Sequence, residues 1–204
     1  MNKYIIDYSV SPEIYNFDGT PSLIIQQNFL SEKEFNNLID NLKDINLKHD
    51  SRSLNRKSLC LKYEKHKNIY DCIYKNNNLK KLIDILTNKN YKEKPQYPIE
   101  YRLYPLGSQG MNWHQDTSMF TPNALECVLT VTNTSDSNFL WKINNHTFST
   151  TPEVNTLMIV RPEAIVHSVS PINQGERKIL KFIIEFNNSI PKDEFNREIN
   201  SCPH

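Results

Sequence analysis

The sequence predicts an α+β fold in which helices near the N-terminus cover one face of a β-rich core. Apolar residues recur at helical spacing in the first part of the chain. Beyond Pro95, short runs rich in Tyr, Val, Thr, Ile and Phe are separated by clusters of Gly, Pro, Asn and Ser. Some eight short strands after a helical region favour a sandwich or a jelly roll (double-stranded β-helix), with the N-terminal helices packed on the major sheet.

The first elements follow from local signals. Residues 22–28 have the composition of a strand. Ser31 with Glu34 forms a capping box that predicts a helix over residues 32–43. A second apolar stripe runs over residues 68–86 and is interrupted by three consecutive asparagines, so we expect two helices with a turn between them.

The last predicted strand has two unlike faces, because side chains alternate with a period of two. We expect helices to cover its apolar face and a functional cavity to lie against its mixed face. The apolar face carries Leu180, Phe182, Ile184 and Phe186, and the mixed face carries Arg177, Ile179, Lys181 and Ile183. The predicted strands of the β region are residues 98–104, 111–114, 127–133, 139–143, 146–149, 156–160, 164–169 and 177–186.

The length of 204 residues suits one domain with a sizeable core. Residues 1–95 are expected to supply a strand and helices that support the barrel. Residues 96–188 are expected to form the double-stranded β-helix that carries the catalytic site, and residues 189–204 a polar tail on the surface.

Charge and cysteine content exclude several classes. The chain has 24 Lys plus Arg against 23 Asp plus Glu, so neither a nucleic-acid nor a membrane partner is favoured. No apolar run approaches the roughly 18 residues of a membrane span, and residues 1–10 lack the apolar core of a secretory signal. Four cysteines without CxxC spacing predict reduced thiols in a cytoplasmic protein.

Two histidines and one aspartate stand at a spacing typical of a metal site. His114 and Asp116 are two apart on a predicted strand, so both side chains project to the same face. His167 lies 53 residues later at the end of another predicted strand, and Arg177 follows ten residues after it. Two imidazoles and one carboxylate are the facial triad of non-haem Fe(II) oxygenases, which leaves coordination positions open. The pattern predicts a metal centre with a cation nearby.

Glycine placement supports this interpretation. The chain has only four glycines; Gly110 precedes His114, and Gly175 precedes Arg177, so we expect backbone turns that position these side chains. His146 lies between the two motif strands but follows a turn-like Asn-Asn pair, and it is not expected to be a ligand.

With these residues, the sequence resembles the Fe(II)/2-oxoglutarate-dependent dioxygenases, and within them the prolyl 4-hydroxylase-like branch. The resemblance extends from about residue 23 to residue 186. It rests on an entry strand and first helix at residues 28–39, on YRLYPLGSQGMNWHQD at residues 101–116, and on VHSVSPINQGERKILKFIIEF at residues 166–186.

The resemblance implies roles for individual residues. His114, Asp116 and His167 would bind Fe(II), and Arg177 would hold the distal carboxylate of 2-oxoglutarate. Collagen-type prolyl hydroxylases usually have Lys at that position, but a guanidinium also binds carboxylates through its bidentate fork. Tyr104 stands where related enzymes place a cosubstrate-contacting Tyr.

Two further basic residues lie on the same predicted strand as Arg177, and their expected roles differ. Lys181 shares a face with Arg177, so it either reaches the cosubstrate pocket or forms a structural salt bridge, whereas Lys178 points to the opposite face of the strand.

The implied activity is hydroxylation, with 2-oxoglutarate and O₂ converted to succinate and CO₂ and with ascorbate as reductant. A protein or peptide side chain, plausibly proline, is the expected substrate, and loops at residues 117–126 and 50–67 are expected to set specificity.

Three alternatives remain. The first is a nucleic-acid demethylase, although that group usually carries a second Arg six residues after the first, where this chain has Ile183, and the chain lacks a basic stripe. The second is a small-molecule hydroxylase. The third is a non-catalytic metal- or ligand-binding jelly roll.

Overall fold

The computed structural model of the chain describes residues 11–53, 55–87 and 89–203. Its helices in these residues are α1 (Glu32–Leu42), α2 (Tyr63–Tyr74), α3 (Asn77–Leu86) and α4 (Asp193–Ser201). The predicted capping box is present, since Ser31 and Glu34 cap α1 reciprocally. At the predicted turn between the next two helices, the Asn76 side chain accepts two backbone N–H groups and caps α3. The α2 helix begins before the predicted residue 68, and His66 interrupts its helical geometry.

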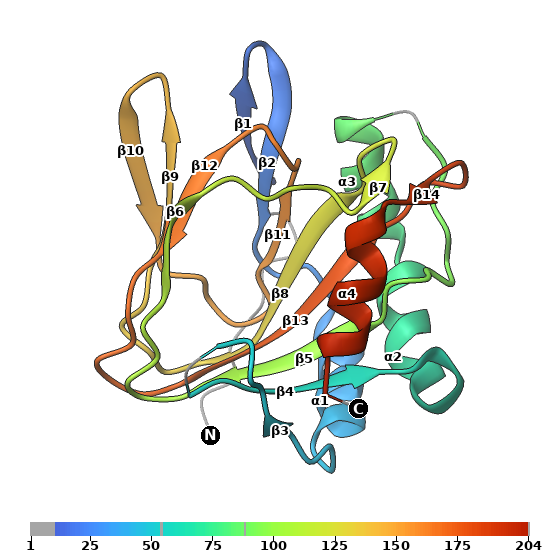
Figure 1. Cartoon of the computed structure of the whole chain (residues 1–204), viewed down its shortest axis with the longest axis vertical. Coiled ribbons are helices and arrows are strands. Elements are labelled where there is room, and N and C mark those ends of the chain that lie inside the picture. Colours follow the sequence, from blue (N-terminus) through green and yellow to red (C-terminus); the bar gives the residue numbers. More distant parts are fainter. Residues whose placement is uncertain (1–10, 54, 88, 204) are drawn as a thin grey trace.

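The strands form two larger antiparallel sheets and one short pair (Figure 1). The eight-stranded sheet has the order β1-β2-β11-β8-β13-β5-β4-β3. Its strands are β1 (Glu13–Phe17), β2 (Thr20–Gln26), β3 (Lys48–His49), β4 (Lys57–Leu61), β5 (Ile99–Tyr104), β8 (Leu125–Asn133), β11 (Leu157–Val160) and β13 (Arg177–Ile184).

The four-stranded sheet has the order β10-β9-β12-β6, and β14 pairs with β7 apart from it. All eight predicted strands of the β region are present within a few residues of their predicted limits. The strands of the four-stranded sheet and of the short pair are β6 (Met111–His114), β7 (Phe120–Thr121), β9 (Phe139–Ile143), β10 (His146–Thr150), β12 (Val166–Val169) and β14 (Ile190–Pro191).

Two apolar clusters divide the molecule into layers. The larger cluster joins the inner faces of α1, α2 and α3 to one face of the eight-stranded sheet. The second cluster lies between the two sheets, where Leu23 and Met158 meet Phe139 and Trp141. Leu180, Phe182, Ile184 and Phe186 belong to the helix-facing cluster, so the predicted apolar face of β13 is against the helices. On the opposite face of β13, Arg177, Ile179 and Lys181 line the cavity between the sheets, whereas Ile183, predicted on the same face, packs in a third apolar cluster with Phe120 and Phe195.

The segment expected to be a polar tail is folded. It forms β14 and α4, and the side chains of Phe195 and Cys202 are buried. Residues 50–67, expected to be a specificity loop, instead supply β4 to the eight-stranded sheet and the start of α2.

The prediction of reduced cysteines is wrong for two of the four residues. Cys60 on β4 and Cys202 after α4 form a disulfide across 142 residues of sequence, whereas Cys72 and Cys127 are free thiols. The folded tail is the physical reason, because α4 returns the chain end to β4. Cysteine content therefore no longer argues for a reducing compartment.

Among the described residues, no helix has the length and apolar character needed to cross a bilayer. The first ten residues, for which the sequence predicts no secretory signal, lie outside the described part of the chain.

Candidate metal centre and anion pocket

The three predicted ligands converge at one end of the space between the sheets. His114 ends β6 and His167 lies on the neighbouring strand β12, where the two are direct register partners. Asp116 follows β6, and its carboxylate oxygens lie 3.6 Å from His114 Nε2 and 3.4 Å from His167 Nε2. One ligand atom from each residue lies within 4.8 Å of the others, so one cation can lie between them.

Local hydrogen bonds orient both imidazoles. His114 Nδ1 lies 2.7 Å from the carbonyl oxygen of Asn112, and His167 Nδ1 lies 3.1 Å from that of Ile165. A proton on Nδ1 leaves the Nε2 lone pair of each ring directed at the other ligands, as in metal-bound histidines. His114 Nε2 is buried without a hydrogen-bond partner in the described chain, an arrangement that a metal ion would satisfy.

The electrostatics favour the neutral ligand form of His167. Burial lowers the pKa of this imidazole, and it outweighs the opposing attraction of Asp116. Two neutral nitrogens and one carboxylate suit a divalent first-row transition metal better than a hard cation such as Ca²⁺, which prefers oxygen ligands.

A cavity of about 120 Å³ extends from this centre between the two sheets. Asp116 and His167 line one part of it, and Arg177, Tyr104 and Lys181 line the wall formed by the eight-stranded sheet. Most of the remaining lining is apolar: Met111, Val128, Phe139, Met158, Val160, Val169, Ile172 and Ile179.

Arg177 is the cation without a carboxylate partner in this cavity. Its side chain is buried, its Nε atom has no hydrogen-bond partner, and it forms no ion pair with any described residue. Burial lowers the pKa of Arg177 to about 10, which is still far enough above neutrality for the guanidinium to stay charged. An unpaired buried cation is costly, so its presence indicates a site that an anion completes.

The other cations of the cavity are neutralised by acids. Lys181 Nζ lies 2.9 Å from Glu126 Oε2, and Arg102 Nη2 lies 2.8 Å from Glu100 Oε2. Lys181 thus lines the pocket and also has the salt bridge that the sequence left open. The charge balance of the described lining leaves one positive group, Arg177, for an anion.

Tyr104 faces the same region. It is the register partner of Arg177 on β5, and Arg102 Nη1 donates to its hydroxyl at 3.4 Å. Burial alone would raise the pKa of Tyr104, but Arg102 and Arg56 lower it below its ordinary value. The phenol is therefore a polar group held beside Arg177 in a cationic surrounding.

Two glycines build the turns that the sequence predicted. A Cβ at Gly110 would lie 2.2 Å from the carbonyl oxygen of Val169, and one at Gly175 would lie 2.1 Å from that of Thr134. Both residues have positive φ, so no other residue fits these close approaches without strain. The first turn leads into β6, and the second leads into Arg177.

Two residues that the sequence did not assign to the site, His146 and Lys178, lie outside the cavity lining. His146 is exposed on β10, and Lys178 pairs with Glu176.

Sequence reasoning did not single out Arg102 and Glu126. Arg102 is two residues before Tyr104 on the same strand, so strand alternation would have placed it on the same face; Glu126 carries no comparable signal.

Solved structures with a similar fold include prolyl hydroxylases and a protein with nickel and 2-oxoglutarate bound. A prolyl-4-hydroxylase from Pseudomonas putida superposes with a TM-score of 0.62 at 13% identity, covering 80% of this chain and 92% of the other. A prolyl hydroxylase from Trichoplax adhaerens, in complex with a peptide fragment of the hypoxia inducible factor, gives 0.61 at 14% identity over 81% and 84%. HygX from Streptomyces hygroscopicus, with nickel, 2-oxoglutarate and hygromycin B bound, gives 0.64 at 8% identity over 82% and 84%.

The chain therefore has the fold of the 2-oxoglutarate-dependent Fe(II) oxygenases, prolyl hydroxylases among them. The resemblance inferred from the sequence motifs is confirmed at the level of the fold. No protein-family model matches the sequence, and no curated protein matches it as a sequence relative.

Proposed function

We propose that this protein is an Fe(II)- and 2-oxoglutarate-dependent hydroxylase built on a double-stranded β-helix. One observation carries the proposal: the cavity that Asp116 and His167 of the convergent metal-ligand cluster line is also lined by Arg177, a buried guanidinium without a carboxylate partner among the described residues. A 2-oxo dicarboxylate has matching chemistry, with a chelating 2-oxo acid at one end and a carboxylate at the other.

Each residue has a separate task in this proposal. His114, Asp116 and His167 hold the metal, and Arg177 with Tyr104 binds and orients the distal carboxylate. Ferrous iron, when bound, supplies open coordination positions for the 2-oxo acid and O₂, whose reaction yields succinate, CO₂ and a hydroxylated product. Ascorbate would serve as reductant. The apolar lining keeps bulk water from the reacting groups.

The size of the cavity favours a substrate that reaches in from outside. Its volume of about 120 Å³ is smaller than the roughly 300–1,000 Å³ of pockets that enclose a drug-sized ligand. A cosubstrate would fill most of it, so we infer that the primary substrate presents one group at the mouth, as a side chain of a protein or peptide does.

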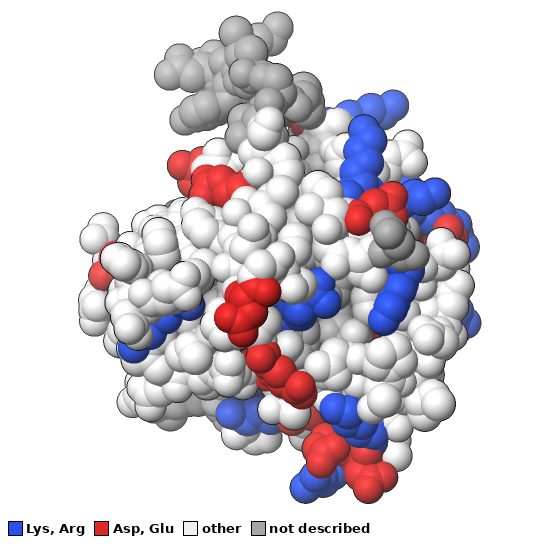
Figure 2. Space-filling view, turned by 90° about the horizontal axis from the view of Figure 1, so that it is seen from above, with Lys and Arg blue, Asp and Glu red and all other residues white. Residues whose placement is uncertain are grey.

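The charge on the face shown in Figure 2 does not favour a nucleic-acid substrate. Figure 2 shows the face that carries the tips of the β1–β2 and β9–β10 hairpins, where Lys and Arg are mixed with Asp and Glu and form no continuous basic stripe. Phosphate-backbone binding relies on such clustered cations.

The test is conversion of 2-oxoglutarate by the full chain with Fe(II), O₂ and ascorbate, measured as succinate. We expect slow turnover without primary substrate and stimulation by proline-containing peptides. Asp116→Ala should abolish succinate formation, and His146→Ala should leave it unchanged, because His146 is remote from the cavity lining. Absence of both succinate formation and metal binding in the folded wild-type protein would refute the proposal.

A small-molecule hydroxylase is the second candidate. HygX has hygromycin B bound within a fold that superposes on 82% of this chain. Stimulation of succinate release by polar small molecules, with none by peptides, would favour this candidate over the peptide hydroxylase.

A further inference from the structure

The end of the described chain is fastened over the loop that follows the metal-ligand motif. We call residues 189–203, which contain β14, α4 and Cys202, the C-terminal strap. Its β14 strand pairs with β7, and the Lys192 N–H donates to the carbonyl oxygen of Met119 at 2.8 Å. The ring of Phe195 lies 5.2 Å from that of Phe120. The strap thus holds residues 117–124, which begin directly after Asp116.

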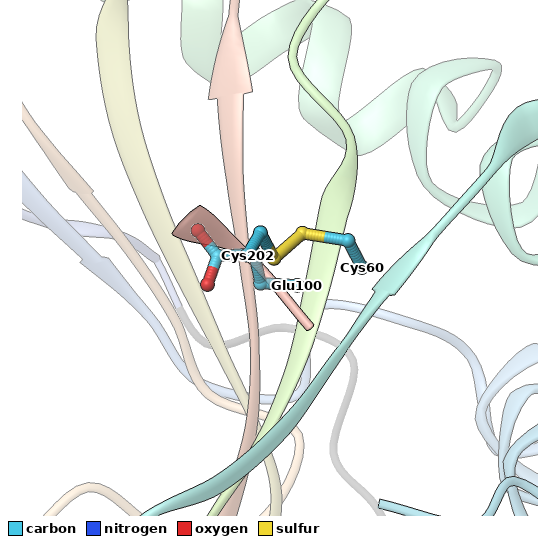
Figure 3. Close-up of side chains that lie close together, drawn as sticks. All are labelled: Cys60, Glu100 and Cys202. Atoms are coloured by element: carbon cyan, nitrogen blue, oxygen red, sulfur yellow. A yellow bond between two sulfur atoms is a disulfide. The ribbon is translucent and has the colours of Figure 1, made fainter. Parts of the chain in front are cut away.

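The other end of the strap is fixed covalently. Cys202 is bonded to Cys60 on β4, and the Cys60 N–H donates to the carbonyl oxygen of Pro203 at 2.8 Å. Figure 3 shows the bond crossing from the strap to β4 beside the carboxylate of Glu100. Both cysteines are at least 95% buried.

An ion-pair network connects this disulfide to the anion pocket. Arg52 Nη2 lies 3.7 Å from Cys202 Sγ and 2.7 Å from Glu100 Oε2. Glu100 in turn binds Arg102, which lines the cavity and donates to Tyr104. The disulfide is therefore connected to two parts of the site. The strap links it to the loop after Asp116, and the ion-pair network links it to the cavity wall that carries Tyr104.

The other attachments of α4 are the packing of Phe195 on Tyr97 and Phe120 and a 3.8 Å contact between Arg52 and Glu198, which is exposed. Within α4 only Phe195 is buried, and Ile199 is partly buried. A helix of nine residues is marginal without tertiary packing. Opening of this helix would expose the disulfide to small molecules without unfolding the sheets.

We propose that Cys60–Cys202 is a thiol–disulfide exchange site at which small thiols and disulfides set how firmly the strap holds residues 117–124. In the reductive direction the Cys60–Cys202 bond breaks, two small thiols are oxidised to one small disulfide, and their protons appear on the two protein thiols. The reverse reaction with a small disulfide restores the bond. The inference goes beyond the proposed hydroxylation and does not require it.

A metal site is the competing interpretation of the same cluster, since Cys60, Glu100 and Cys202 lie within ligand distance of one another. The two sulfur atoms are bonded to each other, so neither is a thiolate that can bind a metal. The structure therefore contains these two cysteines as the disulfide, the oxidised form of a thiol–disulfide pair.

The experiment compares hydrogen–deuterium exchange of the full chain after equilibration with glutathione disulfide and after reduction with a phosphine. We expect reduction to speed exchange roughly tenfold or more in residues 117–124 and 189–203, and to leave residues 139–150 of β9 and β10 unchanged. Thiol counting should give two free thiols before reduction and four after it. No metal or cosubstrate is present, so the outcome is independent of the proposed oxygenase activity.

Two variants complete the test. Cys202→Ser should exchange like the reduced protein without any reductant, whereas Cys72→Ser, which removes a free thiol on α2, should keep the full redox response. If Cys202→Ser does not fold, the reduced wild-type protein decides the matter. Four free thiols after equilibration with glutathione disulfide, or equal exchange of residues 117–124 in both redox states, would overturn the proposal.

Discussion

The two sheets that enclose the cavity position their functional side chains by different means. On the four-stranded side, His114 and His167 are each oriented by a carbonyl oxygen two residues earlier in the chain. On the eight-stranded side, Arg102 and Tyr104 are held by an ion-pair network that reaches Arg52, far away in sequence, through Glu100. The metal side is organised locally, whereas the anion side depends on long-range contacts.

This difference indicates which substitutions should affect ligand binding and which should affect the stability of the fold. Among the residues that the structure describes, the metal ligands and Arg177 have no carboxylate partner, apart from the contacts of Asp116 with the two histidines. Glu100, in contrast, is fully buried between cations. We therefore expect substitutions of the metal ligands and Arg177 to weaken binding of the metal or of 2-oxoglutarate. Substitution of Glu100 should instead lower the stability of the fold.

The largest effect is expected at the metal ligands. His167→Ala should weaken binding of Fe(II), or of Ni(II) as a stable probe, by more than the roughly 100-fold that loss of an outer hydrogen-bond partner causes. Isothermal titration calorimetry of the full chain measures this. His146 makes the same hydrogen bond to a carbonyl oxygen two residues earlier but lies on exposed β10, so His146→Ala is the matched control. Equal affinities of the two variants would contradict the assignment.

The next effect is expected at Arg177. Arg177→Met should weaken 2-oxoglutarate binding by about 2–5 kcal/mol, because a carboxylate buried in this pocket would lose its cation. The free energy of unfolding should not fall, since no carboxylate of the described chain pairs with Arg177. Lys178→Met, on the other face of β13, should leave cosubstrate affinity unchanged. A loss of stability without a loss of affinity would contradict the assignment of Arg177 to the residues that bind and do not stabilise the fold.

The smallest effect is expected at Glu100 and depends on pH. Burial alone would raise the pKa of Glu100, but Arg102, Lys181 and Arg52 lower it from 4.5 to about 2. Because the folded-state pKa is below the unfolded one, this carboxylate stabilises the fold above about pH 4.5, and its contribution is lost as the pH falls toward about 2.

Urea unfolding tests this prediction. Glu100→Gln should lower the free energy of unfolding at pH 7 by about 1–3 kcal/mol, because Arg102 loses its carboxylate partner. Arg52 and Lys181 keep Asp50 and Glu126 as partners, which limits the loss. The difference from wild type should shrink between about pH 4.5 and 2. Glu176→Gln, at an exposed ion pair, is the control. A difference between Glu100→Gln and wild type that does not change with pH would show that the network does not hold the carboxylate ionised.

The sequence predicted the elements with strong local patterns. The strands at residues 111–114 and 139–143 have the predicted limits, because Gly or Asn turns flank them. The β4 strand was missed because the lysines around it resemble a solvated segment, and its place is set by pairing with β5. The C-terminal strap was missed because only Phe195 marks the buried side of α4.

The candidate site divides in the same way. The metal-ligand side chains and Arg177 could be selected from spacing alone, because each motif is short and each strand has a period of two. The partners Glu126 and Glu100 could not, since they are defined by which strands are neighbours in the sheet. The Cys60–Cys202 pair likewise has no spacing motif across 142 residues.

The two-faced strand β13 has a consequence for insertions and deletions. Arg177, Ile179 and Lys181 line the cavity, and Leu180, Phe182 and Ile184 belong to the helix-facing core. If one residue is removed from the turn at Gly175 and β13 slides by one position along its partner strands to compensate, the two sets exchange faces, which places a guanidinium in the core and a leucine in the pocket. A change of two residues keeps every side chain on its own face, so length variation in this turn is tolerable only in even steps.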